Sequence, residues 1–70
     1  MSTNTAAHIG KKLQSARKNS DLTQAEVAKK AGTQVNHYAK IERGETTPSL
    51  KMLEKILKAL DVKSSDVLPF

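Results

Sequence analysis

Residues 23–44 read TQAEVAKKAGTQVNHYAKIERG, and this stretch decides the fold. It begins with a capping box, in which the Thr23 hydroxyl accepts from the third backbone amide of a helix and Glu26 returns a bond to the cap amide. Gly32 then ends the first helical pattern, and Gly44 ends a second one over about residues 34–43. Because only residues 32–34 join the two, the pattern predicts helices that cross steeply instead of running antiparallel.

Helical spacing continues on both sides of this stretch. Apolar residues recur at helical intervals over about 7–20, and a broad apolar stripe begins after Pro48, with Ser49 as its expected N-cap. A short fifth turn is expected at about 64–68. Since no segment alternates like a strand, we predict an all-α, five-helix domain over residues 8–70 and a flexible N-terminus over 1–7.

Length and composition exclude several classes of protein. Seventy residues allow one domain, and the absence of cysteine excludes disulfides and thiolate metal sites. No signal peptide or membrane-spanning run is evident, so we expect a cytoplasmic protein without membrane contact. With two histidines, no Ser-His-acid grouping and no phosphate loop, the sequence predicts no enzyme, no cofactor and no metal site.

The positive charge is unevenly placed along the chain. The net charge of +5 resides entirely in residues 1–44, while residues 45–70 are neutral. A basic segment followed by a neutral segment suggests one surface that faces a polyanion and a second surface with a different role. Ordinary solubilising charge is the alternative interpretation.

Two helices joined by so short a turn form the helix-turn-helix arrangement, which lays one helix across the DNA backbone and the other in the major groove. The sequence resembles the Cro/C1-type, phage-repressor-like (XRE) family over about residues 8–68. The matching segments are Leu22–Ala28, Ala31–Gly32, Lys40–Gly44, Pro48–Leu50 and Leu57–Val62. The resemblance implies a phage-repressor-like fold with a central helix-turn-helix. It also implies a sequence-specific regulator of transcription, with repression as the expected outcome, that binds duplex DNA and is associated with the nucleoid when bound.

The resemblance also implies roles for individual residues. Expected base contacts come from Val35, Asn36, His37 and Lys40. Expected phosphate contacts come from Thr23, Gln24, Gln34 and Arg43. Arg17 and Glu42 occupy positions where many members of the family form a partly buried ion pair between the first and third helices.

The chemistry of the expected reading residues is consistent with base contact. Asn36 can pair with adenine N6 and N7, and Lys40 can donate to guanine or to a phosphate. Val35 can offer only apolar contact, for which a thymine methyl is the natural partner. The alternative for each is a solvated helix residue.

Four residues depart from the family pattern. Thr33 replaces an aliphatic residue in the turn, and Gln34 replaces the usual Ser or Thr cap, so that Thr33 or water would cap the helix instead. Tyr38 replaces a buried Ile, and Ala16 replaces a Leu, which would make room for the larger ring. We expect the Tyr38 ring in the core with its hydroxyl at the rim.

The sequence leaves two alternatives for the role of the last residues and two for the function of the chain. Val67, Leu68 and Phe70 are expected to form a homodimer seam for binding a palindromic operator, or else to complete the monomer core. The competing function is an antitoxin, which would bind a protein toxin and regulate its own operon. Single-stranded RNA binding lacks the aromatic residues needed for stacking.

Overall fold

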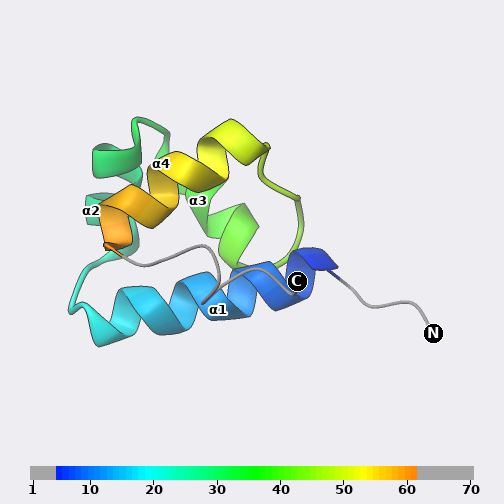
Figure 1. Ribbon diagram of the computed structural model, residues 1–70, viewed down its shortest axis with the longest axis horizontal. Coiled ribbons are helices and arrows are strands. Elements are labelled where there is room, and N and C mark those ends of the chain that lie inside the picture. Colours follow the sequence, from blue (N-terminus) through cyan, green and yellow to red (C-terminus); the bar gives the residue numbers. More distant parts are fainter. Residues whose placement is uncertain (1–4, 62–70) are drawn as a thin grey trace.

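The computed structural model describes residues 5–61, which fold into α1 (Thr5–Asn19), α2 (Gln24–Ala31), α3 (Val35–Glu42) and α4 (Leu50–Leu60). No strand occurs within this range, which confirms the all-α prediction. In Figure 1, α1 runs along one side of the molecule and the other three helices pack above it. The expected fifth helix at about 64–68 lies outside the described residues, so a count of five is not confirmed.

One core joins the four helices. Its fully buried large side chains come from every element: Leu13 from α1, Val27 from α2, Tyr38 and Ile41 from α3, and Ile56 from α4. α2 packs against both α3 and α4, and α1 packs against α3. α3 is therefore held between α1 and α2.

The expected caps are present in the structure. The Thr23 hydroxyl accepts from the Glu26 amide at 3.1 Å, and the Thr23 amide donates to Glu26 Oε1 at 2.8 Å, which completes the capping box. Gly32 ends α2 in the left-handed conformation, with φ at +75°, where a side chain would be strained. Ser49 accepts from the Met52 amide at the start of α4. These contacts confirm the predicted helix boundaries at Thr23, Gly32 and Ser49.

The first helix begins earlier than the sequence predicts. Residues 5–7, expected in a flexible N-terminus, form the first turn of α1. Alanine has the highest helix propensity, and Ala6 and Ala7 follow Thr5 directly. Ala7 also lies against Gly44, where an added Cβ would be 2.9 Å from the Ala7 Cα.

Gly10 allows α1 to approach the end of α3 very closely. A methyl group at this position would lie 2.5 Å from the carbonyl oxygen of Glu42 and 2.6 Å from that of Ile41. The contact fixes α1 against the last turn of α3.

Candidate nucleic-acid interface

The four expected base-contacting residues lie on the exposed side of α3. Val35 is 41 % exposed, and Asn36, His37 and Lys40 are exposed as well. Asn36 and Lys40 are four residues apart, which places them on the same helix face, one turn from each other. The structure thus brings an amide and an ammonium group together on a surface that solvent, or a DNA groove, can reach.

The opposite side of α3 anchors the helix in the core. Tyr38 and Ile41 are each 0 % exposed, and they pack among residues of the other helices. The side chains that hold α3 in the core are therefore different from those that α3 exposes to solvent.

The expected phosphate-contacting residues cluster at the starts of α2 and α3. Thr23 is exposed, but its hydroxyl already accepts the capping bond. Gln34 is the N-cap residue of α3 and is exposed, and its side chain makes no capping hydrogen bond. The first backbone amides of each helix carry the positive end of the helix dipole, which favours anions such as phosphate.

A shallow depression connects these two helix starts. It runs from the end of α1 across the first turn of α2 to Val35 on α3. Its lining residues are Arg17, Lys18, Asp21, Leu22, Thr23, Gln24, Ala25 and Val35. Two of the predicted phosphate-contacting residues, Thr23 and Gln24, thus share this depression with Val35, one of the predicted base-contacting residues.

Gln24 has a second role that the sequence does not reveal. Its Nε2 donates to Glu42 Oε1 at 3.0 Å, and the residue is only partly exposed. The amide group has two N–H donors and one carbonyl acceptor, so one donor is committed to Glu42. A link from the start of α2 to the end of α3 was not expected, because 18 residues separate the two side chains.

The expected ion pair between α1 and α3 is present. Arg17 Nε donates to Glu42 Oε2 at 2.7 Å, and Arg17 Nη2 donates to Glu42 Oε1 at 3.2 Å. Arg17 Nη1 also donates to the carbonyl oxygen of Leu22 at 2.9 Å, just before α2. Together with Gln24, these contacts join α1, α2 and α3 through one carboxylate.

The environment keeps the Glu42 carboxylate ionised. Burial is the largest influence and opposes ionisation, but the polar groups around the carboxylate, first Arg17, then Tyr38 and Gln24, together outweigh burial and hold the pKa of Glu42 below its usual value. The same contact with Glu42 raises the pKa of Arg17. The charged pair is therefore a fixed part of the structure at neutral pH.

The Tyr38 hydroxyl is not at the rim of the core, contrary to expectation. The side chain is entirely buried, and within the described residues the hydroxyl has no partner that meets hydrogen-bond geometry. Burial raises the pKa of Tyr38 most, and the Glu42 carboxylate raises it further, because it lies close to the hydroxyl although the contact does not meet hydrogen-bond geometry. Ala16 is partly buried and packs against the same core.

Arg43 caps the end of α3 and is exposed. Its guanidinium forms an ion pair with Glu45, and both side chains are about half exposed, at 54 % and 52 %. Arg43, the predicted phosphate contact, is thus held in the free protein by an acidic residue two positions later in the chain.

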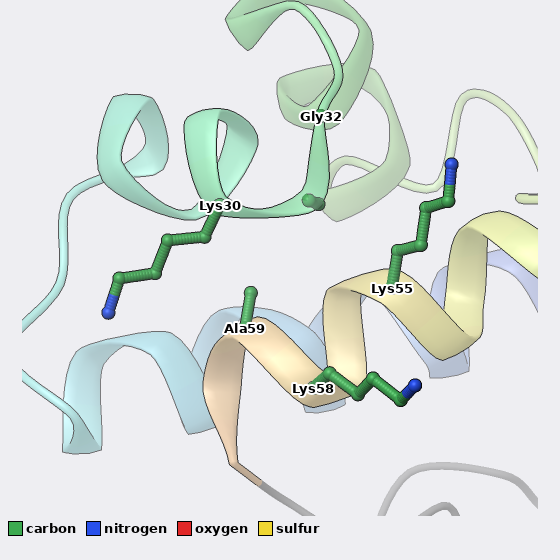
Figure 2. A pocket seen from close by; sticks show the side chains of 6 residues that line it. Lys30, Gly32, Lys55, Lys58 and Ala59 are labelled. Atoms are coloured by element: carbon green, nitrogen blue, oxygen red, sulfur yellow. The ribbon is translucent and has the colours of Figure 1, made fainter.

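A second depression lies between the end of α2 and α4, apart from the α3 surface. Figure 2 shows Lys30 and Gly32 at the end of α2, and Lys55, Lys58 and Ala59 on the facing part of α4. Its lining residues are Lys30, Ala31, Gly32, Lys55, Lys58 and Ala59. These lysines contribute positive charge on a face that does not include Asn36 or Lys40.

The expected dimer residues Val67, Leu68 and Phe70 lie outside the described residues. Between residues 5 and 61, no group of three metal-ligating side chains is close enough to hold a metal ion. None of the helices in this range is both long and apolar enough to cross a membrane.

Comparison with known proteins connects this surface to regulators of transcription. A helix-turn-helix profile matches residues 13–67. The immunity repressor protein of Bacillus phage phi105 is 36 % identical over 59 residues, which cover 84 % of this chain and 41 % of the repressor. The HTH-type transcriptional regulator SinR of Bacillus subtilis (strain 168) is 38 % identical over 55 residues, covering 77 % of this chain and 50 % of SinR. The chain thus spans half or less of the length of these two relatives.

A solved structure extends the comparison. The restriction–modification controller protein C.AhdI from Aeromonas hydrophila matches with a TM-score of 0.86 and 25 % identity, covering 90 % of this chain and 96 % of C.AhdI. The short turn, the exposed polar face of α3 and the adjoining start of α2 together define a helix-turn-helix DNA-binding domain of transcriptional regulators. The chain belongs to the Cro/C1-type (XRE) helix-turn-helix family. The prediction that it is not an enzyme agrees with this family.

Proposed function

We propose that the chain is a sequence-specific repressor of transcription that binds a palindromic operator in duplex DNA as a homodimer, in the cytoplasm, with α3 in the major groove. The observation that carries this proposal is the division of α3 into two faces. Tyr38 and Ile41 hold the helix in the core, while Asn36 and Lys40 are exposed on a shared face. A rigidly held helix with free polar groups can read base edges.

The roles of the individual residues follow from their chemistry. Base contacts are assigned to Val35, Asn36, His37 and Lys40. Phosphate contacts are assigned to Thr23, Gln24, Gln34 and Arg43. For Gln24, the N–H that does not bond to Glu42 remains available as a donor to phosphate.

Repression and dimerisation rest on different arguments. Repression is supported by the similarity to the phage phi105 immunity repressor protein. Dimerisation is favoured because one recognition helix covers too few base pairs to select a genomic site, whereas two copies read half-sites about 34 Å apart. The named relatives are regulators, and the antitoxin alternative with a protein toxin as partner receives no support from them.

Selection of bound duplexes from a random pool tests the proposal. The Asn36→Ala variant should lose about 1–3 kcal/mol on the selected duplex and little on random DNA, since only base contacts carry sequence information. The Arg43→Ala variant should lower the affinity for the selected duplex and for random DNA alike. Lys40→Ala, which removes an exposed lysine from α3, should weaken DNA binding, whereas Lys58→Ala, which removes an exposed lysine from the second depression, should bind like the wild type. If the wild-type protein enriches no duplex even at low salt, the proposed function is wrong.

A further inference from the structure

Glu45 lies at the edge of the surface proposed to face DNA, next to two of its cations. The Glu45 backbone amide donates to the carbonyl oxygen of Lys40 at 3.0 Å, which fixes this residue beside the last turn of α3. Its carboxylate accepts from Arg43 Nε, and Arg43 Nη2 lies 3.4 Å from the second carboxylate oxygen. An acidic side chain thus occupies the position beside Arg43 that a phosphate oxygen would take.

The Arg43–Glu45 pair contributes little to the stability of the fold. Both side chains are about half exposed and only two residues apart. Exposed pairs of this kind are typically worth between nothing and a small fraction of the folding free energy, because solvent screens them and ordering the side chains has an entropic cost. The consequence of this contact is therefore to be sought at the surface proposed to face DNA and not in the stability of the monomer.

The carboxylate remains charged at neutral pH. The hydrogen bond from Arg43 has the largest effect and lowers the pKa of Glu45; desolvation opposes it, and the charges of Arg43 and Lys40 lower the pKa further. One negative charge accordingly faces both cations that we assign to DNA contact at the end of α3.

We propose that Glu45 is a determinant of DNA affinity that acts as an internal competitor: its carboxylate holds Arg43 in the free protein and must be displaced when a phosphate binds there. The proposal rests on the proposed function. Because the phosphate backbone is the same in every duplex, the competition lowers affinity for random and selected DNA alike.

Glu45→Gln tests this proposal, and Glu54→Gln, which removes another exposed carboxylate, on α4, is the matched control. Both variants change the net charge by the same amount. At low salt, Glu45→Gln should bind random and selected duplexes on the order of 5-fold more tightly than the wild type, as expected for one nearby charge in water. The gain should shrink as salt is added. Glu54→Gln should bind like the wild type, and both variants should keep the wild-type thermal midpoint within a few degrees.

A second comparison isolates the competition for Arg43. In an Arg43→Gln background, adding Glu45→Gln should give a clearly smaller gain, because the competed cation is absent. Unchanged affinity of Glu45→Gln would overturn the proposal, and so would an equal gain from Glu54→Gln, which would indicate an effect of net charge alone. Loss of affinity only for the selected duplex would show that Glu45 contacts a base instead. If the wild type binds neither duplex, the proposed function itself is wrong. If the wild type binds DNA but the variants bind with the same affinity, only the proposal for Glu45 is wrong.

Discussion

Arg17 donates two hydrogen bonds to Glu42, from Nε at 2.7 Å and from Nη2 at 3.2 Å, across 25 residues of sequence. The two side chains are 13 % and 1 % exposed, so the pair is largely removed from water. Since such a pair is costly to break but contributes modestly when intact, its main effect is to fix the position of α3 relative to α1.

Arg17→Met should destabilise the protein by about 3 kcal/mol, because it leaves the buried Glu42 carboxylate without its charge partner. Urea unfolding followed by circular dichroism measures the change. Lys18→Met, at the exposed neighbouring position, should alter the free energy of unfolding by less than about 0.5 kcal/mol. The double variant Arg17→Met, Glu42→Met should recover part of the loss; if it is less stable than Arg17→Met alone, the unpaired charge is not the cause.

Acid should weaken the wild type in a way that depends on Glu42. The folded pKa of Glu42 lies below its usual 4.5. Its contribution to stability is therefore complete above the unfolded pKa and is lost as the pH falls through the folded pKa. Glu42→Gln, although less stable at pH 7, should lose less of its remaining stability on acidification, whereas Glu54→Gln should follow the wild-type profile. Urea midpoints measured in steps from neutral to acidic pH give these slopes, and parallel curves for Glu42→Gln and wild type would contradict the prediction.

Tyr38→Phe should leave stability within about 1 kcal/mol of the wild type, because the buried hydroxyl has no partner with hydrogen-bond geometry among the described residues. Tyr38→Ala should cost about 3–5 kcal/mol through loss of the ring from the core. Thermal and urea unfolding compare the two variants. A loss well above 2 kcal/mol for Tyr38→Phe would mean that the hydroxyl does donate to Glu42 in solution.

Gly10→Ala should destabilise the protein by about 1–3 kcal/mol, since the added methyl group collides with backbone carbonyls that cannot move independently of α3. Gly32→Ala provides the comparison. At that position no atom lies within 4 Å of the added carbon, and only the positive φ opposes the change, with a cost of about 1–2 kcal/mol. If Gly10→Ala has the midpoint of the wild type, α1 does not approach α3 as closely as described.

Leu68→Glu should shift the protein toward monomer and weaken operator binding without loss of helicity, because a charge would disrupt an apolar dimer seam. Sedimentation of wild type and variant at equal concentration, and circular dichroism of both, make the measurement. The matched variant Leu50→Glu makes the same substitution at a 71 % exposed position at the start of α4, and it should leave the oligomeric state unchanged. A wild-type protein that stays monomeric even with palindromic DNA would show that Val67, Leu68 and Phe70 do not form a dimer seam.

Local rules account for the parts of the structure that the sequence predicts well. The capping box at Thr23 and the left-handed Gly32 are each formed with residues no more than four positions away in the chain. Both can therefore be predicted directly from the sequence. The Arg17–Glu42 pair was expected only through resemblance to a family, because nothing local connects two residues 25 positions apart.

Most of the features that were missed depend on packing between helices. The bond between Gln24 and Glu42 and the burial of the Tyr38 hydroxyl both depend on the positions of neighbouring helices. The start of α1 at Thr5 is different, because the helix propensity of Ala6 and Ala7 was a local signal for it. Gly10 gave no signal, since a glycine inside a helical pattern does not reveal what lies against it. The Arg43–Glu45 contact joins residues only two positions apart, so the acidic residue after Arg43 was a local signal for it.

The separation of the two faces of α3 has a consequence for how such a protein can change over time. Substitutions at Val35, Asn36 and Lys40 alter side chains that project away from the core, while Tyr38 and Ile41 continue to seat the helix. New combinations at the outward positions can therefore arise one at a time without passing through unfolded intermediates. Under the proposed function, descendants of one gene can come to bind different DNA sequences while the packing of Tyr38 and Ile41 in the core stays the same.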